Sequence, residues 1–146
     1  MSGIDVCLYE VMALPGARGA ALVDWTCGLA LGSAGEPPCG EPESAAVEAA
    51  ELARMSMEYG TFRSPDDEAP PDDGTGPDDE TPPGPGATGA VEDLIVTTRT
   101  AYHLLRFVET GHESSVFLHL WLDRDTGNLA VARLCLRDAA RRLVLE

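Results

Sequence analysis

The stretch VFLHLWL, from Val116 to Leu122, is apolar along nearly its whole length and decides which fold the chain can adopt. Side chains of a β-strand alternate between its two faces, so this stretch presents an apolar set to each side. The first set is Val116, Leu118, Leu120 and Leu122, and the second is Phe117, His119 and Trp121. A strand that is apolar on both faces is covered on both faces. We therefore expect a layered structure with this strand inside it.

Two further strands precede this stretch and a helix follows it. Residues 91–98 and 102–108 carry strand signals. After a turn at residues 125–128, Asn128 is the expected N-cap of a final helix. The inward positions of that helix are Leu129, Ala132, Leu136, Ala139 or Ala140, and Leu143.

The N-terminal half predicts two helices around a hairpin. Apolar residues at helical spacing form a stripe from Ile4 to Leu14, and Pro15 and Gly16 end that helix. Strands are expected at residues 20–23 and 29–32, joined by a turn at residues 24–28. A second helix over residues 43–59 carries a stripe of small residues, which suits close packing on a sheet or against a symmetry mate. The stripe is Ala46, Ala49, Ala50, Ala53 and Met57.

These elements predict a single α/β domain over residues 1–146 with the order α-β-β-α-β-β-β-α. Short turns favour a five-stranded, mostly antiparallel sheet, and the interspersed helices favour coverage of both its faces. One segment, at about residues 63–87, interrupts the pattern. Between Ser64 and Gly86 the sequence holds seven Pro, four Gly and eight acidic residues, and nothing apolar larger than Ala69. Such a segment cannot bury enough surface to offset backbone ordering, so we expect a disordered acidic loop.

Composition argues against several classes of protein. The net charge is −15, and such an acidic chain is repelled by nucleic acid. No apolar run reaches the roughly 18–20 residues that cross a bilayer, and the N-terminus does not resemble a signal peptide, so we expect a cytoplasmic protein without membrane insertion. All ten basic residues are Arg, which excludes a P-loop lysine or a Schiff base. We expect neither an enzyme nor a bound cofactor.

Candidate catalytic and metal-binding residues are few. His103 and His119 lie on predicted strands and can be neighbours, but a metal site needs a third converging ligand. His112 falls in a predicted turn. The two serines at positions 114 and 115 lack a GxSxG context, and the only acid or base near them in the sequence is Glu113. The four cysteines form no CxxC pair, so we expect reduced structural thiols. No catalytic or metal site is predicted.

The corners of the chain resemble those of the roadblock family, the dynein light chain superfamily with many bacterial members. The matching stretches are Leu14–Ala20 (LPGARGA), Leu22–Asp24, Gly28–Leu29 and Asn128–Arg133 (NLAVAR). The resemblance implies a roadblock-like α/β sandwich that forms a non-enzymatic homodimer and docks small Ras-like GTPases or serves as a scaffold. It implies that the second helix and the third strand meet at the interface, next to the acidic loop. The interface residues are then Ala46, Ala49, Ala50, Ala53, Met57, Leu94, Ile95 and Val96.

Two charged regions and one pocket leave alternatives open. The last helix carries an Arg at every fourth position of one outer face, which is either a solvated face or one that receives an acidic partner or the chain's own acidic loop. That row is Arg133, Arg137 and Arg141. The loop itself either solubilises the chain or docks on a basic partner. A second function class is a small-ligand sensor or enzyme subunit with a pocket near Trp25, His103 and Trp121.

Replacing residues 64–86 by a short Gly-Ser linker should leave the domain folded, because nothing in the segment is apolar enough to contribute to a core. Shortening a flexible loop several-fold changes its closure free energy by only about 1–2 kcal/mol. Urea unfolding followed by tryptophan fluorescence measures the effect. A non-cooperative transition in the deletion variant would show that the segment is structural.

Overall fold

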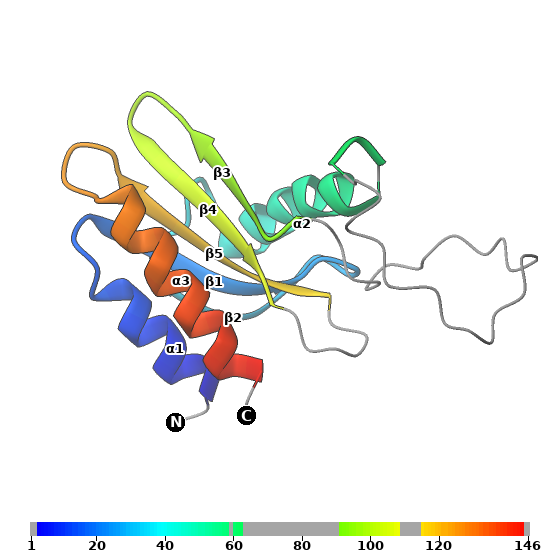
Figure 1. Ribbon diagram of the computed structural model, residues 1–146, viewed down its shortest axis with the longest axis horizontal. Coiled ribbons are helices and arrows are strands. Elements are labelled where there is room, and N and C mark those ends of the chain that lie inside the picture. Colours follow the sequence, from blue (N-terminus) through cyan, green and yellow to red (C-terminus); the bar gives the residue numbers. More distant parts are fainter. Residues whose placement is uncertain (1–2, 59, 63–90, 109–114, 145–146) are drawn as a thin grey trace, which may run out of the picture.

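The five strands form one antiparallel sheet in the order β2-β1-β5-β4-β3 in the computed structural model (Figure 1), which describes residues 3–58, 60–62, 91–108 and 115–144. The elements are α1 Gly3–Met12, β1 Ala17–Asp24, β2 Leu29–Gly35, α2 Pro42–Glu58, the 3-10 turn η1 Gly60–Phe62, β3 Asp93–Thr97, β4 Ala101–Phe107, β5 Val116–Asp123 and α3 Leu129–Val144. The predicted order and fold class are confirmed. The predicted acidic loop at residues 63–87 lies outside the described residues.

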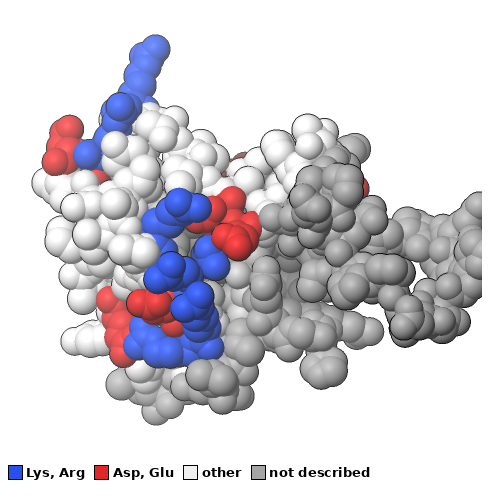
Figure 2. Space-filling model, viewed as in Figure 1, with Lys and Arg blue, Asp and Glu red and all other residues white. Residues whose placement is uncertain are grey.

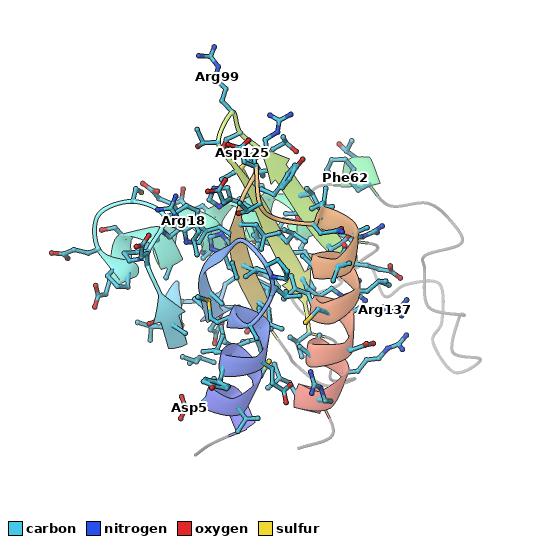
Figure 3. All side chains as sticks on the ribbon, turned by 90° about the vertical axis from the view of Figure 1, so that its left-hand side faces the viewer. Asp5, Arg18, Phe62, Arg99, Asp125 and Arg137 are labelled. Atoms are coloured by element: carbon cyan, nitrogen blue, oxygen red, sulfur yellow. The ribbon has the colours of Figure 1, made fainter. Side chains whose placement is uncertain are left out.

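The sheet carries α1 and α3 side by side on one face and α2 on the other (Figures 1 and 3). Strand β5 occupies the middle of the sheet, between β1 and β4. Its two predicted faces are the observed ones: Leu118, Leu120 and Leu122 belong to the core under α1 and α3. Phe117 belongs to a second core under α2 and is fully buried. None of the described helices has both the length and the apolar character needed to span a bilayer.

Local signals place the corners where they were expected. Gly16 has φ of 79°, and a Cβ there would lie 2.6 Å from the backbone nitrogen of Gly127, so the first corner packs backbone against backbone. The Asn128 Oδ1 accepts a hydrogen bond from the Val131 N–H at 3.1 Å and caps α3 as predicted. Cys7 lies in the core under α1 and α3, and Cys135 packs against that core.

Strand boundaries differ from the prediction mainly in the first hairpin. Strand β2 continues to Gly35 rather than ending at residue 32, although its last residues are poor strand formers. Pairing with β1 extends it, because residues 19–22 of β1 have partners along residues 32–35. Strand β3 is shorter than predicted and begins at Asp93.

The alanine stripe of α2 packs on the chain's own sheet. Ala46, Ala50 and Ala53 are at most 4% exposed and share a core with Trp25 and Phe117. Of the two packing modes that small residues allow, the structure therefore shows the helix on the sheet. Their side chains are not available to a symmetry mate.

Ala53→Leu should lower the free energy of unfolding by about 1–3 kcal/mol, because Ala53 is fully buried and extra methyl groups overpack a dense core. Glu51→Leu, at an exposed position of the same helix, is the matched control and should change stability by less than about 0.5 kcal/mol. Urea unfolding followed by the fluorescence of Trp25 and Trp121 measures both. Equal stability of the two variants would contradict the packing of α2.

Candidate functional site

Helix α2 leaves part of its sheet face open. It lies mainly over β2 and β1, and a groove of about 380 Å³ remains beside it over β3 and β4. Glu48 and Leu52 of α2 line one wall, and Val96, His103 and His119 line the sheet side. We call this hollow the β3–α2 groove. It combines apolar walls with a small number of polar groups.

Two histidines meet at the floor of the β3–α2 groove. His103 and His119 face each other across β4 and β5, and the His103 Nδ1 lies 3.1 Å from the His119 Nε2, within hydrogen-bond distance. The His103 ring also stacks on Trp121, with centroids 5.8 Å apart and planes 6° from parallel. The prediction that these histidines can be neighbours is correct.

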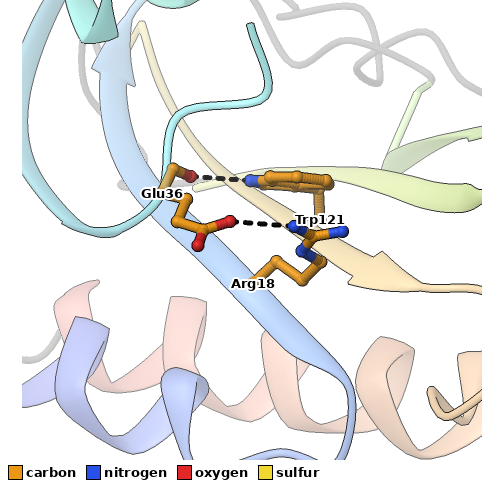
Figure 4. A network of polar contacts seen from close by, with 3 residues as sticks. All are labelled: Arg18, Glu36 and Trp121. Carbon is orange, nitrogen blue, oxygen red and sulfur yellow. Dashed lines mark hydrogen bonds and ion pairs between the residues drawn. The ribbon is translucent and has the colours of Figure 1, made fainter.

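Trp121 continues the stack into a polar network at the surface (Figure 4). Its indole N–H donates to the Glu36 carbonyl at 2.8 Å. The Arg18 guanidinium lies 4.7 Å from the Trp121 ring centroid and donates to the Glu36 carboxylate at 3.0 Å. This network ties β1, β5 and the segment after β2 together. Gly19 permits it, because a Cβ there would lie 1.9 Å from the Glu36 carbonyl oxygen.

The histidine pair is uncharged at neutral pH. Burial, with a smaller contribution from His103, lowers the pKa of His119 to about 4, and burial also lowers the pKa of His103. A neutral pair satisfies the hydrogen bond, because one ring nitrogen donates and the other accepts. Within the described part of the chain no set of three His, Cys, Asp or Glu residues is placed to hold a metal ion. The arrangement suits packing and hydrogen bonding.

Other candidates from the sequence lie elsewhere. Trp25 is 1% exposed in the core under α2 and does not line the β3–α2 groove. The Ser115 hydroxyl donates to Asp24 Oδ1 at 2.8 Å. Burial acts to raise the pKa of Asp24, but hydrogen bonds from Thr26 and Ser115 outweigh it and the net pKa is lowered. These contacts join the ends of β1 and β5. Residues 112–114 lie outside the described part of the structure.

The interface residues implied by the resemblance divide into buried and accessible groups. The alanines of α2 are covered by the sheet, and Met57 packs against the same core. Leu94, Ile95 and Val96 lie on β3, which is an edge strand, and Ile95 and Val96 are each 39% exposed. Sequence reasoning missed the outward apolar residues of α2. Two of these, three positions apart, are Leu52, 39% exposed, and Met55, 57% exposed, and a third, Val47, lies nearer the start of the helix.

One side of β3 is not paired with any described strand. Phe107 N–H donates to the Glu92 carbonyl and Thr98 N–H donates to the Ala101 carbonyl, and these two bonds fix the alternation along the β3–β4 ladder. Antiparallel partners alternate between bonded and non-bonded pairs, so the backbone groups of Ile95 point away from β4. No other described strand lies there.

Arginines gather over α3 and the neighbouring sheet edge (Figure 2). Arg133 Nε lies 2.6 Å from Asp93 Oδ2, and its Nη2 lies 3.3 Å from Asp93 Oδ1, a two-point contact. Asp93 stands directly opposite Arg106 across β3 and β4. Arg137 follows one turn along α3 and points outward (Figure 3), and Arg141 follows after another turn. The structure thus adds Arg106 to the predicted row, which only the strand register could reveal.

His119→Gln should flatten the pH dependence of stability. Between pH 6.5 and about 4 the unfolded state gains a proton at His119 that the folded state does not, so stability is full above this window and falls as pH falls through it. From about pH 7.5 to about pH 5 the wild type should lose roughly 2 kcal/mol more than the variant. Urea titrations at both pH values measure this difference. Parallel losses in the two proteins would show that the pKa of His119 is not depressed.

No protein-family model matches the sequence, and no curated protein matches it either. Solved structures match its fold. Myxococcus xanthus MglB has a TM-score of 0.70 at 16% identity over 99% of this chain and 94% of that chain. A structure described as MglB with tetrameric arrangement has a TM-score of 0.65 at 15% identity over 99% of this chain and 89% of that chain. A Roadblock/LC7 domain from Streptomyces avermitilis has a TM-score of 0.62 at 16% identity over 97% of this chain and 95% of that chain. The chain therefore has the roadblock fold that the resemblance of its corners implies.

Proposed function

We propose that this chain is a non-enzymatic roadblock-type module that forms a homodimer and regulates or scaffolds a small Ras-like GTPase. The dimer is proposed because one edge of β3 pairs with no described strand and lies beside the open β3–α2 groove. An edge strand is normally covered, charged or paired with another chain. Here Leu94, Ile95 and Val96 at its middle carry no charge.

In the proposed dimer two β3 strands pair antiparallel and join the sheets into one. The outward backbone groups of Ile95 then find partners, and the two α2 helices lie over the joined sheet. Leu52 and Met55 of one chain face the β3–α2 groove of the other and cover Val96. This arrangement uses the outer side of α2 in place of its alanine stripe. Ala50→Glu is thus unsuitable as an interface probe, since it would charge the chain's own core.

The GTPase part of the proposal rests on the family resemblance and on the shared fold. The described residues offer a binding surface rather than a reaction centre: the histidines are engaged with each other and with Trp121, and Ser115 donates to Asp24. The Ser115 hydroxyl faces a carboxylate whose pKa is lowered, so Asp24 is a weak base and a poor activator of a nucleophile. The module would act by holding a partner.

A second function is favoured by one observation, the size and polarity of the β3–α2 groove. A hollow of about 380 Å³ with His103, His119 and Glu48 in its walls is large enough for a small metabolite. Such a sensor would be a monomer that retains its ligand on purification. Native mass spectrometry separates the two functions, because a dimer without a retained small molecule supports the module.

Ile95→Pro should convert a wild-type dimer into a monomer. Proline removes a backbone donor that points outward, so the ladder to β4 is kept while the proposed pairing with a second β3 is lost. Met55→Glu places a charge in the same seam. Each change should weaken association by at least about a hundredfold, which is roughly 3 kcal/mol. Sedimentation velocity at micromolar concentration measures the mass.

The matched control is Val131→Glu, which charges a 45% exposed apolar residue on α3, the helix on the face of the sheet opposite to α2. It should sediment as the wild type does. A monomeric wild type would contradict the proposed interface, and so would unaltered dimers of both Ile95→Pro and Met55→Glu. Separately, the immobilised wild-type dimer should retain a Ras-like GTPase from source-cell lysate in a nucleotide-dependent manner. A stable dimer that retains none would remove the GTPase part alone.

A further inference from the structure

One ring nitrogen at the floor of the β3–α2 groove has no hydrogen-bond partner within the described part of the chain. His119 is 9% exposed and lines both this groove and a smaller hollow between the sheet and the segment after β2. Its Nε2 lies 3.1 Å from the His103 Nδ1, whereas its Nδ1 contacts no donor or acceptor among the described residues. In the same residues, the side-chain nitrogens that are both buried and unpartnered belong to Arg106 and Arg137. The His119 Nδ1 is therefore unpartnered but accessible from the hollow.

The histidine pair always leaves one acceptor free. Burial lowers the pKa of both rings, so the pair is uncharged at neutral pH. Each neutral imidazole carries one N–H, and one of these N–H groups forms the bond between the two rings. Whichever ring donates, the two outer nitrogens, His119 Nδ1 and His103 Nε2, are then one donor and one acceptor. The floor of the groove thus offers a hydrogen-bond acceptor in either arrangement.

The charge on the walls selects against anions. Among the described residues that line the groove, Glu48 alone carries a charge at neutral pH, and no arginine belongs to that lining. Arg18, which lies against Trp121, is paired with Glu36 and stays outside the groove. A carboxylate or a phosphate in the groove would therefore face Glu48 without a counter-charge, whereas a cation would be attracted.

The remaining walls are apolar and suit the body of a small organic molecule. Leu52 of α2 and Val96 and Leu105 of the sheet line a hollow of about 380 Å³. Sites for small molecules combine such walls with a few polar groups that fix the orientation of the ligand. The acceptors among those groups are the Glu48 carboxylate and one imidazole nitrogen.

We propose that the β3–α2 groove binds a small primary amine with an apolar body. The ammonium group donates to the Glu48 carboxylate and to the accepting nitrogen of the His103–His119 pair, and the body packs against the apolar walls. An alcohol of the same shape would leave the Glu48 charge uncompensated, and an acid would be repelled by it. This ligand class rests on the second function proposed above, ligand binding in the groove, and is independent of the dimer.

Three compounds that share a phenyl ring and a two-carbon chain test the ligand class: phenethylamine, phenethyl alcohol and hydrocinnamate. At about pH 7.5, where the amine is charged, isothermal titration calorimetry should show phenethylamine binding with a Kd on the order of 1 mM, as expected for a molecule of this size. The alcohol and the acid should each bind at least about tenfold more weakly. Both the full-length chain and its Ile95→Pro variant are titrated, so that a second copy over the groove does not conceal the site.

Matched variants separate the site from the overall charge of the chain. Glu48→Gln keeps the size of the side chain and removes its charge, so the affinity for phenethylamine should fall about fivefold. Glu51→Gln removes the same charge from an exposed position of α2 outside the groove lining, and it should change the affinity by less than about twofold. Equal losses in the two variants would overturn the proposal, because the net negative charge alone would then account for the attraction.

The nitrogen resonances of the histidine rings give a second readout. A donating ammonium fixes which ring donates to the other. One outer nitrogen should therefore move to the resonance position of an unprotonated nitrogen, and the other to that of a protonated one. Binding of phenethylamine without this change would overturn its contact with the histidine pair.

The three compounds also distinguish the ligand class from the function on which it rests. Binding of the alcohol or the acid as tightly as the amine would overturn the amine class and leave the groove as a ligand site. Absence of binding by all three compounds up to about 10 mM would overturn the amine class and the second function together. Sedimentation of the wild type decides the dimer separately.

Discussion

Burial of β5 on both of its faces is the constraint on which the rest of the fold depends. Leu118, Leu120 and Leu122 need one apolar layer, and Phe117 needs another on the opposite side. Here helices on both faces of the sheet cover the two sets, and all four side chains are at most 1% exposed. Full burial of one such side chain stabilises the fold by roughly 1.5–3 kcal/mol. This requirement places β5 in the middle of the sheet and leaves β2 and β3 at the edges.

The two layers are built differently, and the difference creates the candidate site. On one face α1 and α3 pack together and bring larger side chains such as Leu8 and Leu136 to the sheet. On the other face a single helix approaches with alanines and covers mainly β1 and β2. The remaining part of that face holds His103, His119 and Trp121. The two imidazole rings lie within hydrogen-bond distance of each other, and the indole N–H donates to the Glu36 carbonyl. We propose a second copy there because α2 covers this face of the sheet only in part and the adjacent edge of β3 pairs with no described strand.

The sequence predicts those features that depend on local spacing. The two faces of β5, the cap at Asn128, the corner at Gly16 and the element order all follow from periodicity or from one residue's backbone chemistry. Features that depend on register or on distant partners do not follow. The bond from Trp121 to Glu36 spans 85 positions, and the opposition of Asp93 and Arg106 appears only once β3 and β4 are aligned. The alanine stripe of α2 was correctly located. The spacing of small residues shows that another element can pack closely on the helix, but it does not show whether that element is the chain's own sheet or a second copy.

Strand β3 presents different chemistry on its two sides. Alternation sends Leu94 and Val96 toward the α2 side, and Asp93 and Ile95 toward the α3 side. The apolar side meets the β3–α2 groove, while the charged side meets Arg133. Pairing of two β3 strands would use the backbone groups of Ile95 and the apolar side of the strand, and would leave the contact between Asp93 and Arg133 intact. A dimer formed across this edge would bring Arg106 and Arg133 of each chain toward the joined edge, on the side opposite to α2.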